Sequence, residues 1–191
     1  MSSSVKKLGI YGGTFDPIHN GHLRVVVELL TRKIVDRIIL IPAGEPRLRS
    51  EQPIVDGASR LEMCKLAIND LPIELRDRVT ASDIEIKRSG STYAIDTVEE
   101  LEKLGDDLYW IIGSDAYAKI DQWHRSRDLK EKVSFIVIER PGSELEDGID
   151  IGALDISATE IRSDINKKRE PEGVSPSVRK YISERKLYAG K

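Results

Sequence analysis

Several residue types are scarce in this chain, and each scarcity excludes a class of protein. A single cysteine among 191 residues, Cys64, rules out an internal disulfide, so the chain is not a disulfide-stabilised secreted domain. Positive charge is not in excess, because 30 Lys and Arg residues face 33 Asp and Glu residues, and we expect neither nucleic acid nor a membrane as a partner. The N-terminal residues lack the apolar stretch of a signal peptide, which predicts a cytoplasmic protein.

The hydrophobic residues form short runs separated by helix-like segments. They make up 39% of the sequence beside 33% charged residues, as in a folded globular protein, and we expect one domain over residues 1–191. Runs rich in β-branched and aromatic residues predict buried strands at residues 7–11, 36–41, 108–112 and 133–138. Amphipathic segments between them predict helices. This alternation predicts an α/β fold, a Rossmann-like open parallel sheet with helices on both faces.

A helical extension is expected at the C-terminal end, over about residues 157–188. Ser157 can cap its first helix, and Ser175 followed by Pro176 is typical of the start of a second. The apolar side of this second helix would carry Val178, Tyr181 and Ile182.

A glycine-rich segment, GGTFDPIHNGH at residues 12–22, follows the first predicted strand and precedes a predicted helix. Gly12 and Gly13 allow the backbone to approach a ligand closely, and a helix start presents free N–H groups and positive dipole charge. Together, these features predict a phosphate cradle. The segment matches neither the dinucleotide-binding fingerprint nor the P-loop.

Two of the three histidines of the chain, His19 and His22, lie in this segment. Their spacing, with Asn20 as the expected N-cap, lets both imidazoles face the space that the glycines leave open. Two surface histidines on a structural turn are the alternative. A metal site is not predicted, because no Cys, Glu or further His is nearby to complete one.

A second motif, ISATEIR at residues 156–162, begins the C-terminal extension. Ser157 and Glu160 fit a capping box, which is a purely structural interpretation. Ser157, Thr159, Arg162 and the N–H groups of the helix start could also bind phosphate oxygens. The two interpretations are compatible.

Together, the glycine-rich segment and this C-terminal motif resemble the HxGH and ISxTxxR signature of the nucleotidyltransferase superfamily. The resemblance is strongest to the bacterial nicotinate-nucleotide adenylyltransferase family, and it covers nearly the whole chain. It also extends through these stretches: residues 42–46, 60–63, 93–97, 113–115, 123–125 and 140–142.

The resemblance implies that ATP and nicotinate mononucleotide are joined to give deamido-NAD and pyrophosphate, with Mg²⁺ carried in by ATP. It implies that His22 stabilises the α-phosphoryl transition state, that His19 contacts the triphosphate, and that Arg162 holds pyrophosphate. It further implies that these residues bind ATP: Gly12, Gly13, Thr14, Phe15, His19, His22, Gly113, Asp115, Ser157, Thr159 and Arg162.

Binding of the pyridine mononucleotide is implied for Arg49, Tyr93, Thr97, Trp123 and His124. By the resemblance, Trp123 stacks on the nicotinate ring, although a tryptophan that closes the hydrophobic core is the alternative. Trp110, within a predicted strand, is assigned to the core, and so is Cys64.

Two positions depart from the family pattern: Arg49 stands where lysine is common, and Ala94 stands where threonine is common. The loss of a hydroxyl at Ala94 leaves the choice between nicotinate and nicotinamide open. Other members of the superfamily remain alternatives, namely nicotinamide mononucleotide and pantetheine-phosphate adenylyltransferases. A non-catalytic nucleotide sensor is a third, and the sequence does not predict the oligomeric state.

Overall fold

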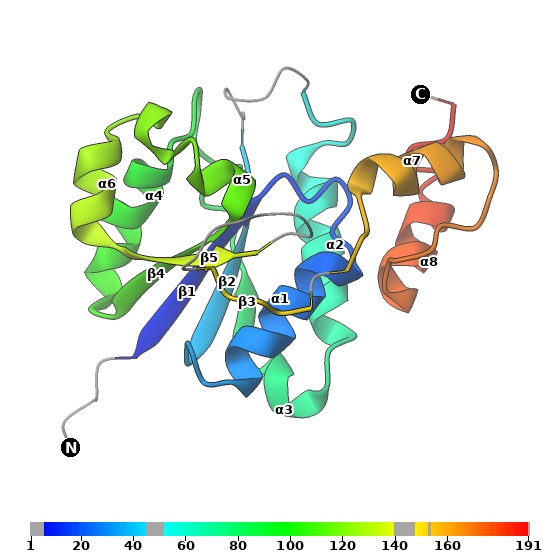
Figure 1. Cartoon of the computed structure of the whole chain (residues 1–191). Coiled ribbons are helices and arrows are strands. Elements are labelled where there is room, and N and C mark those ends of the chain that lie inside the picture. The colour runs from blue at the N-terminus through cyan, green and yellow to red at the C-terminus, as the bar shows by residue number, and fades with distance from the viewer. Residues whose placement is uncertain (1–5, 45–51, 140–147, 153, 191) are drawn as a thin grey trace.

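The computed structural model describes residues 6–44, 52–139, 148–152 and 154–190. Five parallel strands form one sheet in the order β3-β2-β1-β4-β5 (Figure 1). Their bounds are β1 Lys7–Gly13, β2 Arg37–Pro42, β3 Val79–Ala81, β4 Asp107–Gly113 and β5 Ser134–Ile138. The chain winds from β1 to one edge of the sheet and then from β4 to the other. Ligands of such sheets bind beyond the carboxyl ends of the strands at this reversal, here between β1 and β4.

The four predicted strands are confirmed, and one was missed. β3 has only three residues, too few for a recognisable apolar run. β1 also continues beyond Tyr11, because Gly12 and Gly13 pair with Ile41 and Pro42 of β2. These two glycines therefore belong to the strand rather than to the loop.

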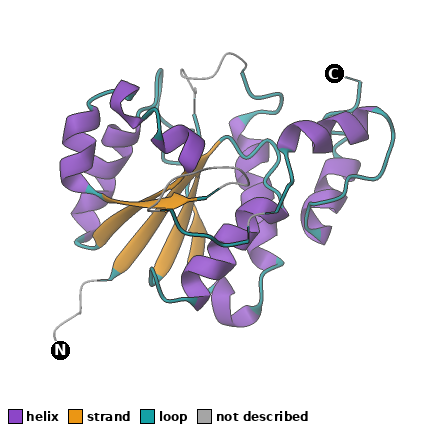
Figure 2. Ribbon diagram, viewed as in Figure 1, coloured by secondary structure: helices purple, strands orange, loops and turns teal. Residues whose placement is uncertain are grey.

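Helices cover both faces of the sheet, as predicted (Figure 2). Their bounds are α1 Asn20–Thr31, α2 Gly57–Asn69, α3 Ile73–Arg76, α4 Ala94–Leu101, α5 Ser114–Tyr117, α6 Ser126–Lys132, α7 Ala158–Asn166 and α8 Pro176–Glu184. Short 3-10 turns follow α4 and α5, at Glu102–Leu104 and Ile120–Gln122.

Two hydrophobic clusters hold these layers together, one on each face of the sheet. The cluster beneath α1 and α2 contains Ile111, whereas the one beneath α4 and α6 contains Trp110 and Ile112. This alternation along β4 follows from the two-residue period of a strand buried on both sides. Cys64 is fully buried and Trp110 is nearly so, as predicted.

The C-terminal extension packs against α2 through α8. Val178 and Ile182 are buried, whereas Tyr181 is half-buried. Asp70, just after α2, accepts hydrogen bonds from the Ser177 backbone N–H at 2.8 Å and from its hydroxyl at 2.6 Å. Since the first N–H groups of a helix lack intrahelical partners, Asp70 satisfies one of them in α8. None of the described helices combines the length and apolar character needed to cross a membrane.

Candidate active site

The loop after β1 is fixed by a buried arginine of α2. Arg60 donates to the backbone oxygens of Thr14 and Ala43, both at 2.7 Å, and to that of Val55 at 3.3 Å. It therefore joins the segments that follow β1 and β2. Burial lowers the pKa of the Arg60 guanidinium, while the nearby Asp16 carboxylate opposes that shift.

His19 and His22 converge, as the sequence predicts. Their ring centroids lie 3.7 Å apart, and the edge of the Phe15 ring packs on His22 with centroids 5.0 Å apart. His19 is buried and His22 is half-buried. At Gly21, between them, a Cβ would lie 2.9 Å from the His19 Nδ1 atom, so the close placement of the two rings requires glycine.

The prediction of Asn20 as the N-cap of α1 is wrong, because His19 occupies that position. The backbone N–H of His19 donates to Nδ1 of His22 at 3.2 Å. A neutral imidazole that accepts at Nδ1 carries its proton on Nε2. The start of α1 thus sets His22 as a hydrogen-bond donor through Nε2.

Arg162 brings the C-terminal motif (residues 156–162) onto the glycine-rich segment. Its Nη1 donates to the backbone oxygen of Asp16 at 2.8 Å, across 146 residues of sequence, and its Nη2 donates to Thr159 Oγ1 at 3.2 Å. A second link joins the N–H of Asn20 to the oxygen of Gly173 at 2.7 Å. Figure 1 shows the segment after β1 passing toward α7.

Ser157 confirms the capping interpretation of this motif. Its hydroxyl accepts from the backbone N–H of Glu160 at 3.2 Å and contacts the Glu160 carboxylate at 3.0 Å. Ser157 and Thr159 are nevertheless exposed to solvent at the start of α7.

The Asp16 side chain was not singled out from the sequence, yet it connects the loop after β1 to the segment before α2 and to the segment after α8. It is 5% exposed, and its carboxylate accepts from the Tyr188 hydroxyl and from the Ile54 backbone N–H, both at 2.7 Å. Tyr188, beyond α8, is also buried. One nearby residue did carry a sequence signal for a buried polar site. Arg60, which interacts electrostatically with Asp16, is a charged residue on the same apolar face of α2 as Cys64.

The aromatic residues predicted to bind the pyridine mononucleotide form a second group. Tyr93 stacks on His124 with ring centroids 4.2 Å apart, and Trp123 meets Trp110 edge-on at 6.1 Å. Trp110 in turn lies under Gly12, where a Cβ would be 3.3 Å from its Cζ2 atom. Trp123 is half-buried, so one part of it completes the core and another part remains exposed.

Thr97 lies deeper than the other predicted binding residues. It is fully buried, and its hydroxyl donates to Glu85 at 2.9 Å. Burial raises the pKa of the Glu85 carboxyl, although hydrogen bonds from Thr97 and from the backbone of Gly44 oppose the shift. Thr97 therefore links α4, in which it lies, to the segment that contains Glu85.

The remaining predicted residues are distributed as follows. Gly113 ends β4 and forms the N-cap of α5, and Asp115 lies exposed in the first turn of that helix. Both are at the carboxyl edge of the sheet, next to β1. Arg49 lies outside the described residues.

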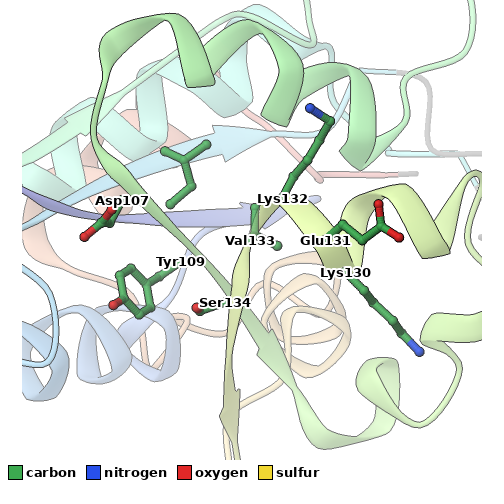
Figure 3. A pocket seen from close by; sticks show the side chains of 8 residues that line it. Asp107, Tyr109, Lys130, Glu131, Lys132, Val133 and Ser134 are labelled. Atoms are coloured by element: carbon green, nitrogen blue, oxygen red, sulfur yellow. The ribbon is translucent and has the colours of Figure 1, made fainter.

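A shallow pocket of about 290 Å³ lies at the opposite edge, where β4 and β5 begin (Figure 3). Both of its lysines are engaged in ion pairs: Lys130 pairs with Asp121, and Lys132 pairs with Glu102. This pocket therefore differs from the histidine site in both position and chemistry. Among the described residues, no three His, Cys, Asp or Glu side chains gather as a metal-binding group.

The chain is similar to known proteins over nearly its full length. Residues 10–164 match the cytidylyltransferase-like family. A probable nicotinate-nucleotide adenylyltransferase of Solibacter usitatus is 38% identical, over 95% of this chain and 99% of that protein. The nicotinate-nucleotide adenylyltransferase of Bacillus subtilis is 34% identical, over 96% and 99%.

The fold is also that of a solved structure, the Plasmodium falciparum nicotinic acid mononucleotide adenylyltransferase complexed with NaAD. The two share a TM-score of 0.82 at 24% identity, over 96% of this chain and 97% of the other. The chain is therefore a member of the cytidylyltransferase-like family and, by its full-length relatives, of the nicotinate-nucleotide adenylyltransferases within it.

Proposed function

We propose that this chain transfers the adenylyl group of ATP to nicotinate mononucleotide, as a step of NAD biosynthesis. A phosphate oxygen of the mononucleotide attacks the α-phosphorus of ATP in line. The new O–P bond forms as the bond to the bridging oxygen breaks, and the electron pair leaves with pyrophosphate. The products are deamido-NAD and pyrophosphate, and no side-chain nucleophile is required.

One contact carries this proposal: the hydrogen bond from Arg162 to the backbone oxygen of Asp16. It supports a site in which cationic and neutral donors from both motifs surround one triphosphate. In that site the Nε2–H of His22 donates to the α-phosphoryl oxygens as their charge grows, and His19 contacts the triphosphate. Arg162, with Ser157, Thr159 and the start of α7, holds the departing pyrophosphate.

The neighbouring groups would bind the rest of the two substrates. The end of β1 and the loop after it, Gly12–Phe15, would follow the phosphates, with Gly113 and Asp115 on the adenosine side. Trp123 would stack on the pyridine ring, and its exposed portion beside the Tyr93–His124 pair supports this role. Thr97 and Arg49 remain predictions for the same substrate.

Magnesium is the metal that we propose for this reaction, carried with ATP. Both carboxylate oxygens of Asp16 already accept hydrogen bonds from Tyr188 and Ile54, so this side chain is not a fitting ligand. When bound, Mg²⁺ would neutralise charge on the phosphate oxygens. The phosphate-binding residues proposed above, His19, His22 and Arg162, would contact those oxygens rather than the metal.

The test is pyrophosphate release by the purified protein with ATP, Mg²⁺ and one acceptor at a time. The acceptors are nicotinate mononucleotide, nicotinamide mononucleotide and 4′-phosphopantetheine. We expect the highest kcat/KM with nicotinate mononucleotide. A clear preference for either of the others would replace the proposed acceptor. ATP binding without release in any reaction would identify a nucleotide sensor instead.

A further inference from the structure

The buried Asp16 carboxylate takes no part in the reaction proposed above, yet it connects three segments of the chain. Its Oδ1 accepts from the Tyr188 hydroxyl and its Oδ2 from the Ile54 N–H, each at 2.7 Å. Its backbone oxygen accepts from Arg162 at 2.8 Å. A displacement of Asp16 would therefore be transmitted to the guanidinium that faces the triphosphate.

Tyr188 is the most distant of these partners in sequence, 172 residues from Asp16. Its side chain is 2% exposed, and its backbone has a φ of 64°, in the left-handed region that non-glycine residues rarely occupy. Such a conformation persists only where the surrounding contacts hold it. In this chain those contacts include the hydrogen bond to Asp16.

The hydroxyl of Tyr188 is held as a donor. Burial, followed by the Asp16 charge, raises the pKa of the Tyr188 hydroxyl above its ordinary value, so it keeps its proton at neutral pH. The Arg60 guanidinium lies near enough to interact electrostatically with both residues. A buried carboxylate with a charged neighbour and two short hydrogen bonds has little freedom to move.

The position of Asp16 also affects the histidines. It lies three residues before His19, the N-cap of α1, and directly after Phe15, which packs on His22. Phe15 is likewise left-handed, with a φ of 49°, and is buried. Asp16 thus anchors a strained turn between the strand and the histidines.

We propose that Tyr188 is a positioning residue for adenylyl transfer: through Asp16, it fixes the carbonyl that orients Arg162 and the turn that presents His19 and His22. The segment that follows α8 is then part of the active-site architecture. This inference rests on the proposed function for its kinetic consequence only, because the ordering of the turn does not depend on the reaction.

The first test is Tyr188→Phe in the full chain, which removes the hydroxyl and keeps the ring. Tyr181→Phe on α8 is the matched control, because it makes the same change on a half-buried tyrosine of the extension. We expect Tyr188→Phe to lower kcat about tenfold, with KM for nicotinate mononucleotide within about twofold. Tyr181→Phe should keep the kcat of the wild type. A kcat for Tyr188→Phe within about twofold of the wild type would overturn the inference.

A double-mutant cycle separates positioning from general destabilisation. If Tyr188 acts through Arg162, Tyr188→Phe should lower kcat much less in an Arg162→Ala background than in the wild type. Equal effects in the two backgrounds would indicate a structural role and would contradict the proposal.

Amide hydrogen exchange gives an answer that is independent of activity. We expect the amides of residues 14–22 to exchange at least about tenfold faster in Tyr188→Phe than in the wild type, and unchanged in Tyr181→Phe. Unchanged exchange in Tyr188→Phe would overturn the inference even if the enzyme is active. If the wild type releases no pyrophosphate, the proposed function fails, and the exchange result still decides the inference.

Discussion

The His22 side chain is oriented by the first turn of α1, in which it lies. The backbone N–H of His19 donates to its Nδ1, which directs a proton to Nε2, and the Phe15 ring packs against its side. A donor held in this way needs little reorganisation when charge develops on a phosphoryl group.

Replacing His22 by Ala should lower kcat by about two to four decades, because it removes a donor to the transition state. Circular dichroism should show an unchanged fold, since His22 is only half-buried. His22→Gln, whose amide can still donate a hydrogen bond, should recover part of the loss. A folded His22→Ala protein that releases pyrophosphate near the wild-type rate would exclude this role.

Trp123 should discriminate between the two substrates. Trp123→Ala is expected to raise the Kd of nicotinate mononucleotide by about tenfold or more, the usual effect of losing an aromatic stacking partner. The Kd of ATP should stay within about twofold, and calorimetric titration measures both. Equal weakening of both ligands would show that Trp123 acts through the core beside Trp110.

The residues that we propose to contact phosphate were singled out from the sequence, whereas the residues that hold them in place were not. His19, His22 and Arg162 lie in short motifs whose chemistry is local. The roles of Asp16 and Tyr188 depend on a hydrogen bond between residues 172 positions apart, and no local sequence pattern predicts such a contact. The charge of Arg60 on an apolar helix face was a usable signal for a buried, hydrogen-bonded group.

Among the elements, long apolar runs were predictable and short or polar ones were not. β1, β2 and β4 have buried residues on both faces, and β5 is buried on one face and half-buried on the other, so their sequences are rich in apolar residues. β3 has three residues and, among the strands that the structure describes, pairs only with β2. Asn20 has a good capping side chain, but the glycine and histidine geometry of the turn starts α1 one residue earlier.

The hydrogen bonds from α8 to Asp70 should stabilise the docking of this helix. Partial burial alone would raise the pKa of the Asp70 carboxyl, but the hydrogen bonds from the Ser177 hydroxyl and backbone N–H hold it below its ordinary value. A carboxylate with a lowered pKa contributes stability above its unfolded-state pKa. That contribution is lost as the pH falls through the folded-state value.

Asp70→Ala should therefore lower the free energy of unfolding at pH 7 by about 1 kcal/mol, as the loss of a helix cap does. The difference from the wild type should shrink as the pH falls below about 4, the ordinary pKa of an aspartate, toward the lower folded-state value. Urea unfolding at several pH values measures both effects, with Asp77→Ala, at an exposed aspartate after α3, as the control. A difference that stays constant down to pH 2 would contradict the account.

Taken as a whole, the molecule places its two motifs together through its topology. β1 lies at the centre of the sheet, so the loop after it opens at the reversal between β1 and β4. The C-terminal extension packs on α2 and brings Arg162 and Tyr188 to that loop from the side. The α/β class was predictable from alternating patterns, whereas this docking depends on tertiary contacts. One domain over residues 1–191 stays a prediction.

The most direct measurement of the central claim is kcat/KM for ATP in Arg162→Ala, with saturating nicotinate mononucleotide. Arg179→Ala is the control, because Arg179 lies in the same extension and pairs with Glu170 instead. If both motifs hold one triphosphate, Arg162→Ala should lose about two decades or more, whereas Arg179→Ala should stay within about twofold of the wild type. A folded Arg162→Ala enzyme as active as the Arg179→Ala control would contradict the account.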